Sequence, residues 1–258
     1  KLESVEIKVK KRKRRNRKVD PAYLLHKSIV EHKVVNDFKG SASYSCNIYN
    51  RVEVDVNNVT DDTRNVLIFR PIEFIFDDID STSLPKKFVP ILFTEAVSDY
   101  YKGYEGKKEI VKGSKVSGLE MESLTQFTGN MYSEYNVYDN YLLFFQKTFV
   151  SRLAINSWLT YNFYLTDSVK KEGATLYKLD FIPRRKNELA FKGHLWTDNN
   201  TFAIHEIHLQ LLKTANVNYI NQFEIDLNYV YRDSAWVLDK EKILMDVYLT
   251  NRTYGFYI

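Results

Sequence analysis

Hydrophobic and polar residues alternate over much of the C-terminal half of the chain, which is the pattern of half-buried β-strands. The clearest stretch runs from Thr175 to Leu212, where short polar segments separate the alternating runs. Strands joined by short polar turns form an antiparallel meander. We therefore predict six strands in this half, at Leu159–Leu165, Thr175–Ile182, Glu188–Trp196, Phe202–Leu212, Ile220–Tyr231 and Trp236–Leu249.

The N-terminal half mixes helical and strand patterns. Asp20 followed by Pro21 is a helix-start signal and predicts a helix over residues 21–36. Apolar residues at helical spacing predict further helices near 88–101 and 119–145, whereas alternation predicts strands at 43–56 and 109–116. The predicted fold class is α+β, with a curved, half-barrel-like antiparallel sheet covered on one face by these helices.

Composition fits an ordinary folded domain, since 44% of the residues are hydrophobic and 27% are charged. Nine of the 37 basic residues lie in the tract 8–18, so the rest of the chain carries 28 basic and 33 acidic side chains. That mildly acidic remainder argues against nucleic-acid binding. The tract could be a linker, a nuclear-localisation or nucleic-acid tail, or a contact to an anionic membrane. The linker is favoured because the partly alternating residues 2–9 predict the end of a strand just before it, and the predicted helix follows it closely.

Candidate catalytic and metal-binding groups are sparse. If Asn199 and Asn200 form a two-residue hairpin loop, His194 lies opposite His205 on the neighbouring strand, and two imidazoles could begin a metal site. No carboxylate or thiol is clearly placed to complete it, so we expect no metal. No phosphate-binding loop, nucleophile elbow or zinc-ligand spacing occurs. We therefore expect no cofactor and no enzymatic activity.

Tyrosines recur at every third position in the segment 132–141. The favoured interpretation is that this face packs on the sheet, and the alternative is that it forms one wall of an apolar cavity. In the alternative, the candidate ligand-binding residues are Tyr132, Tyr135, Tyr138, Phe191 and Trp196. A basic turn containing Arg184 and Arg185 could contact phosphate or an anionic headgroup, although most such turns are simply solvated.

Several long motifs resemble one protein family. They are FVPILFTEAVSDYY at 88–101, KVSGLEMESLTQFTGNMYSEYNVYDNY at 115–141, YNFYLTDS at 161–168 and LDFIPRRKNELAFKGHLWTDNNTFAIHEIHL at 179–209. The chain thereby resembles the middle domain, of unknown function, of large outer-membrane proteins from Bacteroidetes. These proteins carry a carboxypeptidase-regulatory-like β-sandwich before that domain and a β-barrel after it. The resemblance implies that residues 1–19 are the end of the sandwich plus a basic linker, and that residues 20–258 form one β-rich periplasmic domain.

The same resemblance implies a location in the cell envelope, on the periplasmic side of the outer membrane. The expected partners are envelope proteins or the missing β-barrel of the same protein. The meander at Thr175–Leu212 is also similar to the closing strands of periplasmic lipoprotein-carrier half-barrels, which bind acyl chains. We therefore expect a non-enzymatic scaffold or interaction module, and keep as the alternative a carrier or sensor that binds a lipid or other hydrophobic ligand on the concave face.

Overall fold

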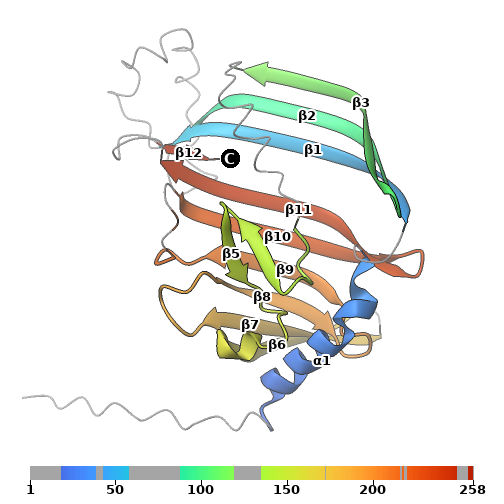
Figure 1. Ribbon diagram of the computed structural model, residues 1–258, viewed down its shortest axis with the longest axis vertical. Coiled ribbons are helices and arrows are strands. Elements are labelled where there is room, and N and C mark those ends of the chain that lie inside the picture. The colour runs from blue at the N-terminus through green and yellow to red at the C-terminus, as the bar shows by residue number, and fades with distance from the viewer. Residues whose placement is uncertain are drawn as a thin grey trace, which may run out of the picture.

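The protein is dominated by one large antiparallel sheet of ten strands (Figure 1). The computed structural model describes residues 19–38, 43–57, 88–118, 135–171, 173–215, 217 and 220–248, together with the backbone of 255–257. The strands of the sheet are β1 (Tyr44–Asn57), β2 (Phe88–Gly103), β3 (Gly106–Gly118), β6 (Tyr161–Lys171), β7 (Ala174–Pro183), β8 (Phe191–Asp198), β9 (Ile204–Leu211), β10 (Ile220–Arg232), β11 (Ala235–Tyr248) and β12 (Gly255–Tyr257).

The strand order is β3-β2-β1-β12-β11-β10-β9-β8-β7-β6. Strands β6 to β11 are therefore a simple meander in which each strand pairs with the next, as the alternation in the sequence predicts. The short strand β12 pairs with β11 on one side and β1 on the other, and so joins the meander to the three strands β1, β2 and β3. The whole sheet is curved (Figure 1).

The helix α1 (Pro21–Asn36) lies across one face of the sheet at its β6 end (Figure 1). Its start follows the sequence signal, because the Asp20 side chain accepts a hydrogen bond of 3.0 Å from the backbone N–H of Ala22 and Pro21 occupies the first turn. Ala22 and Ile29 are buried against the sheet. We call the face that α1 covers the inner face, and the opposite one the outer face.

A second cover on the inner face is residues 135–160, which we call the plug. It contains the hairpin of β4 (Tyr141–Phe144) and β5 (Lys147–Val150) and the short 3-10 helix η2 (Ser157–Leu159). Strands β4 and β5 pair only with each other among the described residues, and form a separate two-stranded sheet in front of the meander (Figure 1). Phe145 and Gln146 both have positive φ, as the favoured two-residue hairpin turn requires.

The expected α+β class with several covering helices is wrong. The one α-helix among the described residues is α1, and residues 88–101 form β2, which pairs with β1 along its length. Four of the first five residues of β2 are buried, on both faces of the strand, and Pro90 is exposed; the buried ones are Phe88, Val89, Ile91 and Leu92. A strand covered on both faces shows a continuous apolar run, which periodicity cannot distinguish from a buried helix. Within 119–145, residues 119–134 lie outside the described residues, and the remainder forms a loop and β4.

The expected strands at 43–56 and 109–116 are confirmed as β1 and β3. The six strands predicted in the C-terminal half are confirmed as β6 to β11, with ends that differ by up to three residues except in β6, which extends six residues beyond the predicted Leu165. Residues 1–18, where the expected end of a sandwich and the basic linker fall, lie outside the described residues.

Candidate functional site on the inner face

The inner face of the meander is filled by aromatic side chains of the protein itself. Phe144 and Phe149 of the plug pack on Phe191 of β8, with ring centroids 5.6 and 4.9 Å from it, and Phe223 of β10 lies 5.3 Å from Phe144. All four are buried. Aromatic rings at these separations contribute more than their buried area alone. An apolar ligand could reach this part of the sheet only if the plug moved.

The structure brings only some of the predicted ligand-binding residues together. Tyr138 and Phe191 are buried in the same core, and Tyr135 packs on it with its ring 4.9 Å from Phe144. Trp196 lies on the outer face, where the ammonium of Lys178 is 5.9 Å from its ring, because it alternates with the inward-facing Leu195. Tyr132 lies outside the described residues.

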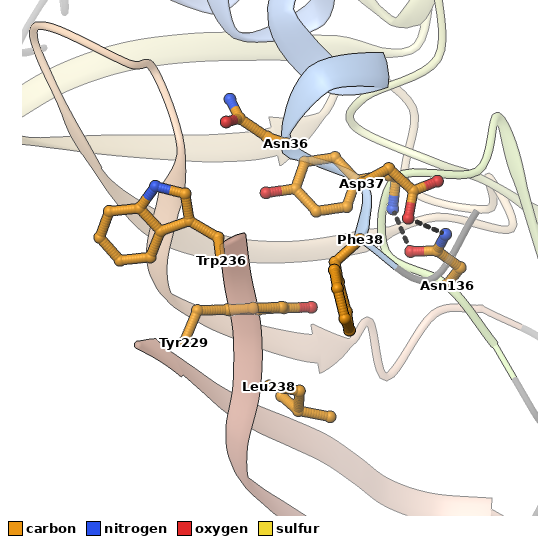
Figure 2. Close-up of a pocket in the computed structure, with 8 residues that line it drawn as sticks. Asn36, Asp37, Phe38, Asn136, Tyr229, Trp236 and Leu238 are labelled. Carbon is orange, nitrogen blue, oxygen red and sulfur yellow. Dashed lines mark hydrogen bonds between the residues drawn. The ribbon is translucent and has the colours of Figure 1, made fainter. Parts of the chain in front are cut away.

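A small pocket lies where the C-terminal end of α1 meets the plug and the strands β10 and β11 (Figure 2). Its volume is about 20 Å³, enough for one water molecule. The Asn136 side chain donates a hydrogen bond of 2.8 Å to Asp37 at its rim. The lining residues are Asn36, Asp37, Phe38, Asn136, Tyr138, Tyr229, Trp236 and Leu238.

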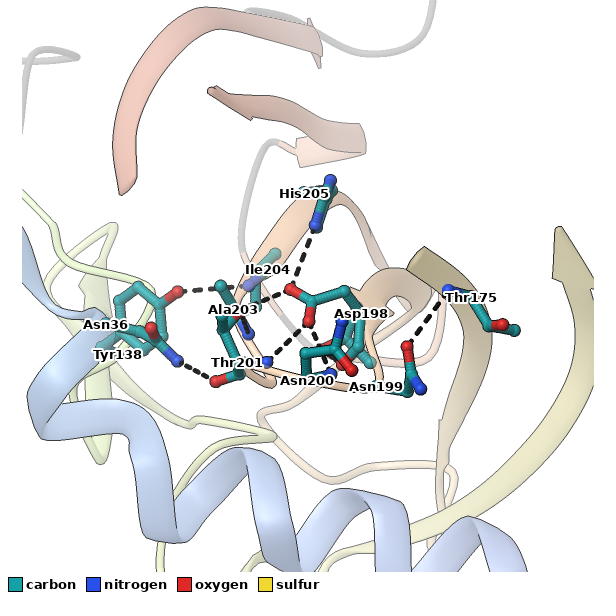
Figure 3. Close-up of polar contacts among 11 residues, drawn as sticks. Asn36, Tyr138, Thr175, Asp198, Asn199, Asn200, Thr201, Ala203, Ile204 and His205 are labelled. Atoms are coloured by element: carbon teal, nitrogen blue, oxygen red, sulfur yellow. Dashed lines mark hydrogen bonds and ion pairs between the residues drawn. The ribbon is translucent and has the colours of Figure 1, made fainter. Parts of the chain in front are cut away.

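A polar turn between β8 and β9 borders this region (Figure 3). The Asp198 carboxylate accepts hydrogen bonds from the backbone N–H groups of Asn200 (2.8 Å) and Thr201 (2.6 Å), and lies 3.3 Å from Nε2 of His205. Burial alone would raise the pKa of Asp198, but the bonds from Thr201, Asn200 and His205 outweigh it and the pKa is lowered. The His205 ring packs on Trp236, with centroids 4.2 Å apart.

The histidine pairing expected from the sequence is wrong. His194 lies opposite His208, with ring centroids 5.4 Å apart, because the β8–β9 connection covers residues 199–203 and β8 has an irregular register between Trp196 and Thr197. Among the described residues, no group of three or more His, Cys, Asp or Glu side chains is placed to hold a metal ion.

The two arginines of the basic turn have different environments. The Arg184 side chain donates a hydrogen bond of 3.0 Å from Nε to the backbone carbonyl of Tyr161, so it ties the turn to β6. Arg185 is exposed and lies 3.8 Å from Glu188. Contact of this turn with an anionic surface stays a prediction.

Sequence reasoning missed the most unusual side chain, Arg152 in the plug. It is 1% exposed, and its Nη2 donates to the backbone carbonyl of Val137 at 3.3 Å. Its Nε and Nη1 have no hydrogen-bond partner among the described residues. Burial lowers the pKa of Arg152 to about 10, which still leaves the group charged at neutral pH. An arginine in a predicted non-strand segment carries no periodic signal, so nothing in the sequence marks it.

A second candidate surface is the strand β3, which ends the sheet in the described structure. All thirteen of its residues are exposed. Four of them are lysines, at positions 107, 108, 112 and 115, against one acidic residue, Glu109. Lys112 lies 2.7 Å from Asp99 of β2, whereas Val111 and Val116 expose more than half of their side-chain surface. This edge combines positive charge with apolar side chains.

Three solved structures resemble the chain weakly. A putative outer-membrane lipoprotein-sorting protein domain from Vibrio parahaemolyticus has 10% identity and a TM-score of 0.29, over 90% of this chain and 88% of that one. A DUF1329 family protein from Desulfovibrio piger has 10% identity and a TM-score of 0.27, over 93% and 90%. A LolA superfamily protein from Nitrosomonas europaea has 9% identity and a TM-score of 0.28, over 90% and 89%. Scores this low support no functional conclusion.

No curated protein matches the sequence. Within the described residues, no helix is long and apolar enough to cross a membrane. One family model does match, over residues 33–258, which is most of the chain and includes the sheet, the plug and the β3 edge. The chain therefore belongs to the family of unknown function DUF5686.

Proposed function

We propose that this chain is a non-enzymatic interaction module of the cell envelope, on the periplasmic side of the outer membrane, and that β3 is its docking edge. The observation that carries the proposal is the exposure of β3 along its full length at the end of the sheet. Such an edge has backbone N–H and C=O groups free of the β2 ladder, which can pair with an extended segment of another protein.

The charge of β3 indicates the kind of segment that would bind. Antiparallel pairing of two β3 strands would bring lysines of one copy near lysines of the other, which disfavours self-association. An acidic, extended segment of an envelope protein would instead complement these lysines. Its apolar side chains could pack beside Val111 and Val116.

The absence of a catalytic role is part of the proposal. The pocket of about 20 Å³ is too small for an organic substrate, since ligand pockets usually exceed roughly 300 Å³. The location in the envelope is supported by the long motifs that resemble outer-membrane proteins. Binding of a lipid on the inner face remains the alternative, and it requires movement of the plug.

The docking edge can be tested by charge reversal. The double variant Lys108→Glu and Lys115→Glu changes two exposed β3 lysines, and its control, Lys170→Glu and Lys171→Glu, changes two exposed lysines at the other edge strand, β6. We expect capture of a defined envelope protein from an outer-membrane extract to fall at least about tenfold for the β3 variant and to stay unchanged for the control. Hydrogen exchange of the β3 amides should slow when that partner is bound.

Two results would contradict the proposal. One is capture that is unaffected by the β3 variant, and the other is a bound partner that protects other strands but not β3. Recovery of cytosolic proteins alone would contradict the proposed location.

A further inference from the structure

Arg152 is a buried cation that has no ion-pair partner within the part of the chain that the structure describes. It is 1% exposed, and no carboxylate of the described residues forms an ion pair with it. Among the described residues its guanidinium makes one hydrogen bond, which is long at 3.3 Å, to the carbonyl of Val137, and it lies 6.0 Å from the centre of the Phe181 ring. A buried charge without a partner is strongly unfavourable, and replacing such groups by apolar residues often stabilises a protein. The position therefore needs an explanation other than stability.

Tyrosine side chains from the plug, β6 and β10 surround this cation. They are Tyr161, Tyr229, Tyr135 and Tyr138. Two of the hydroxyls already donate elsewhere, Tyr135 to Glu241 at 2.6 Å and Tyr161 to the carbonyl of Val150 at 2.7 Å. The hydroxyl of Tyr138 accepts from the backbone N–H of Ile204 at 3.5 Å, so its own hydrogen can be donated to an anion.

Tyr138 and Tyr229 also line the small pocket at the end of α1 (Figure 2). Among the described residues, the hairpin of the plug shares no strand ladder with the ten-stranded sheet. It is held to the meander by the bond from the Val150 N–H to the Leu189 carbonyl, 3.1 Å long, by the bond from the Tyr161 hydroxyl to the Val150 carbonyl, and by the packing of Phe144 and Phe149 on the sheet. A shift of the hairpin would therefore disrupt this packing and these two bonds, but not the ladder of the sheet.

We propose that Arg152 is the anchor of an internal oxyanion site, which takes a carboxylate or phosphate group between the plug and the sheet. A guanidinium provides directional charge-assisted hydrogen bonds to both kinds of group. The oxyanion can be free in solution or the headgroup of a lipid whose chain would lie among the aromatic side chains of the plug. This site is separate from the β3 edge and does not depend on it.

The test measures thermal unfolding of the whole chain with four probes. They are inorganic phosphate, acetate, laurate and the uncharged dodecanol, each titrated up to its solubility or about 10 mM. For the wild type, we expect at least one of phosphate, acetate and laurate to raise the Tm saturably, by about 4 °C at ten times its dissociation constant. Dodecanol should not raise the Tm. Arg152→Met should abolish the rise, whereas Arg232→Met, which changes an exposed arginine, should keep it.

The outcomes separate the sources of the oxyanion. A rise with laurate alone assigns a lipid headgroup, and a rise with phosphate or acetate assigns a free oxyanion. No rise with any of the three, or an equal rise in Arg152→Met, overturns the proposal. If Arg152→Met does not fold, the nuclear magnetic resonance signal of the Arg152 Nε–H in the wild type tests the proposal instead. This signal must shift during the titration if an oxyanion binds the guanidinium. A signal unchanged by phosphate, acetate and laurate also overturns the proposal.

Discussion

Gly193 in the middle of β8 offers a sharp test of the sheet. A Cβ atom at this position would lie 1.9 Å from the backbone oxygen of His208 on β9 and 3.1 Å from the ring of Phe181 on β7. An ordinary contact between carbon and oxygen is above 3 Å, so alanine must push β9 away by more than an ångström. Neighbouring strands are held about 4.8 Å apart by their hydrogen bonds. The backbone of β9 cannot give way without loss of pairing to β8.

The expected cost of Gly193→Ala follows from that displacement. Loss of about two ladder hydrogen bonds costs roughly 2 kcal/mol, and the residual backbone strain adds about 1–3 kcal/mol. We therefore expect the free energy of unfolding to fall by about 3–5 kcal/mol, a large part of the 5–15 kcal/mol typical of a domain. The corresponding fall in Tm is about 10 °C.

Urea denaturation followed by circular dichroism measures this free energy directly. Gly113→Ala on β3 is the matched control, because a Cβ atom there would meet nothing within 4 Å. We expect the control to change the free energy by less than about 0.5 kcal/mol. A value for Gly193→Ala within about 1 kcal/mol of the wild type would refute the pairing of β8 with β9 in this register.

Three further predictions concern the plug, the helix and the β8–β9 turn. Phe149→Ala should lower the free energy of unfolding by about 3–5 kcal/mol because Phe149 is fully buried, whereas Leu143→Ala, exposed on the same hairpin, should stay within about 0.5 kcal/mol in the same urea assay. Burial lowers the pKa of His26 to about 4, below the value of 6.5 in the unfolded chain. Between these two pH values the unfolded state binds more protons than the folded state. The free energy of unfolding should therefore fall by up to about 3 kcal/mol as the pH drops from 6.5 to 4. His26→Gln should flatten that slope, and an unchanged slope would exclude His26 as its source. Asp198→Ala removes the acceptor of the Asn200 and Thr201 amides, so the free energy of unfolding should fall by about 2 kcal/mol and both amides should exchange hydrogen faster. The control Glu206→Ala on β9 should leave the exchange of these amides unchanged. Exchange in Asp198→Ala equal to that of the wild type would show that Asp198 does not hold these two amides.

The meander was predictable because each of its strands has one covered and one solvated face. Alternation is strong in β7 and β9, where Leu179, Ile207 and Leu209 point inward and their neighbours do not. The helix α1 was predictable for a different reason, since its start depends on the local geometry of Asp20 and Pro21 alone.

Other parts of the fold depend on contacts that a single sequence does not reveal. The helical spacing in 88–101 comes from a strand covered on both faces at its beginning, not from a helix. Tyr135, Tyr138 and Tyr141 do not share a helix face, and Tyr141 is exposed while Tyr138 is buried. Of the candidate site, the sequence predicted Tyr138 and Phe191 on the inner face, but Trp196 lies on the outer face and Arg152 gives no pattern at all. Whether a charged side chain is buried depends on packing between distant parts of the chain, which local periodicity does not reveal.

The three-residue strand β12 has a consequence for how the molecule folds. It bridges β11 to β1, and Asp55 pairs with Tyr257 about two hundred residues later in the chain. Pairing across such a separation is slow, because a long loop must close before any contact forms. During synthesis, the hairpins of β1, β2 and β3 must therefore wait for almost the entire chain before they can join the meander. A chain cut after Tyr248 would lose the backbone pairing between the two parts and keep the buried hydrogen bond from the Asn57 side chain to Asp246.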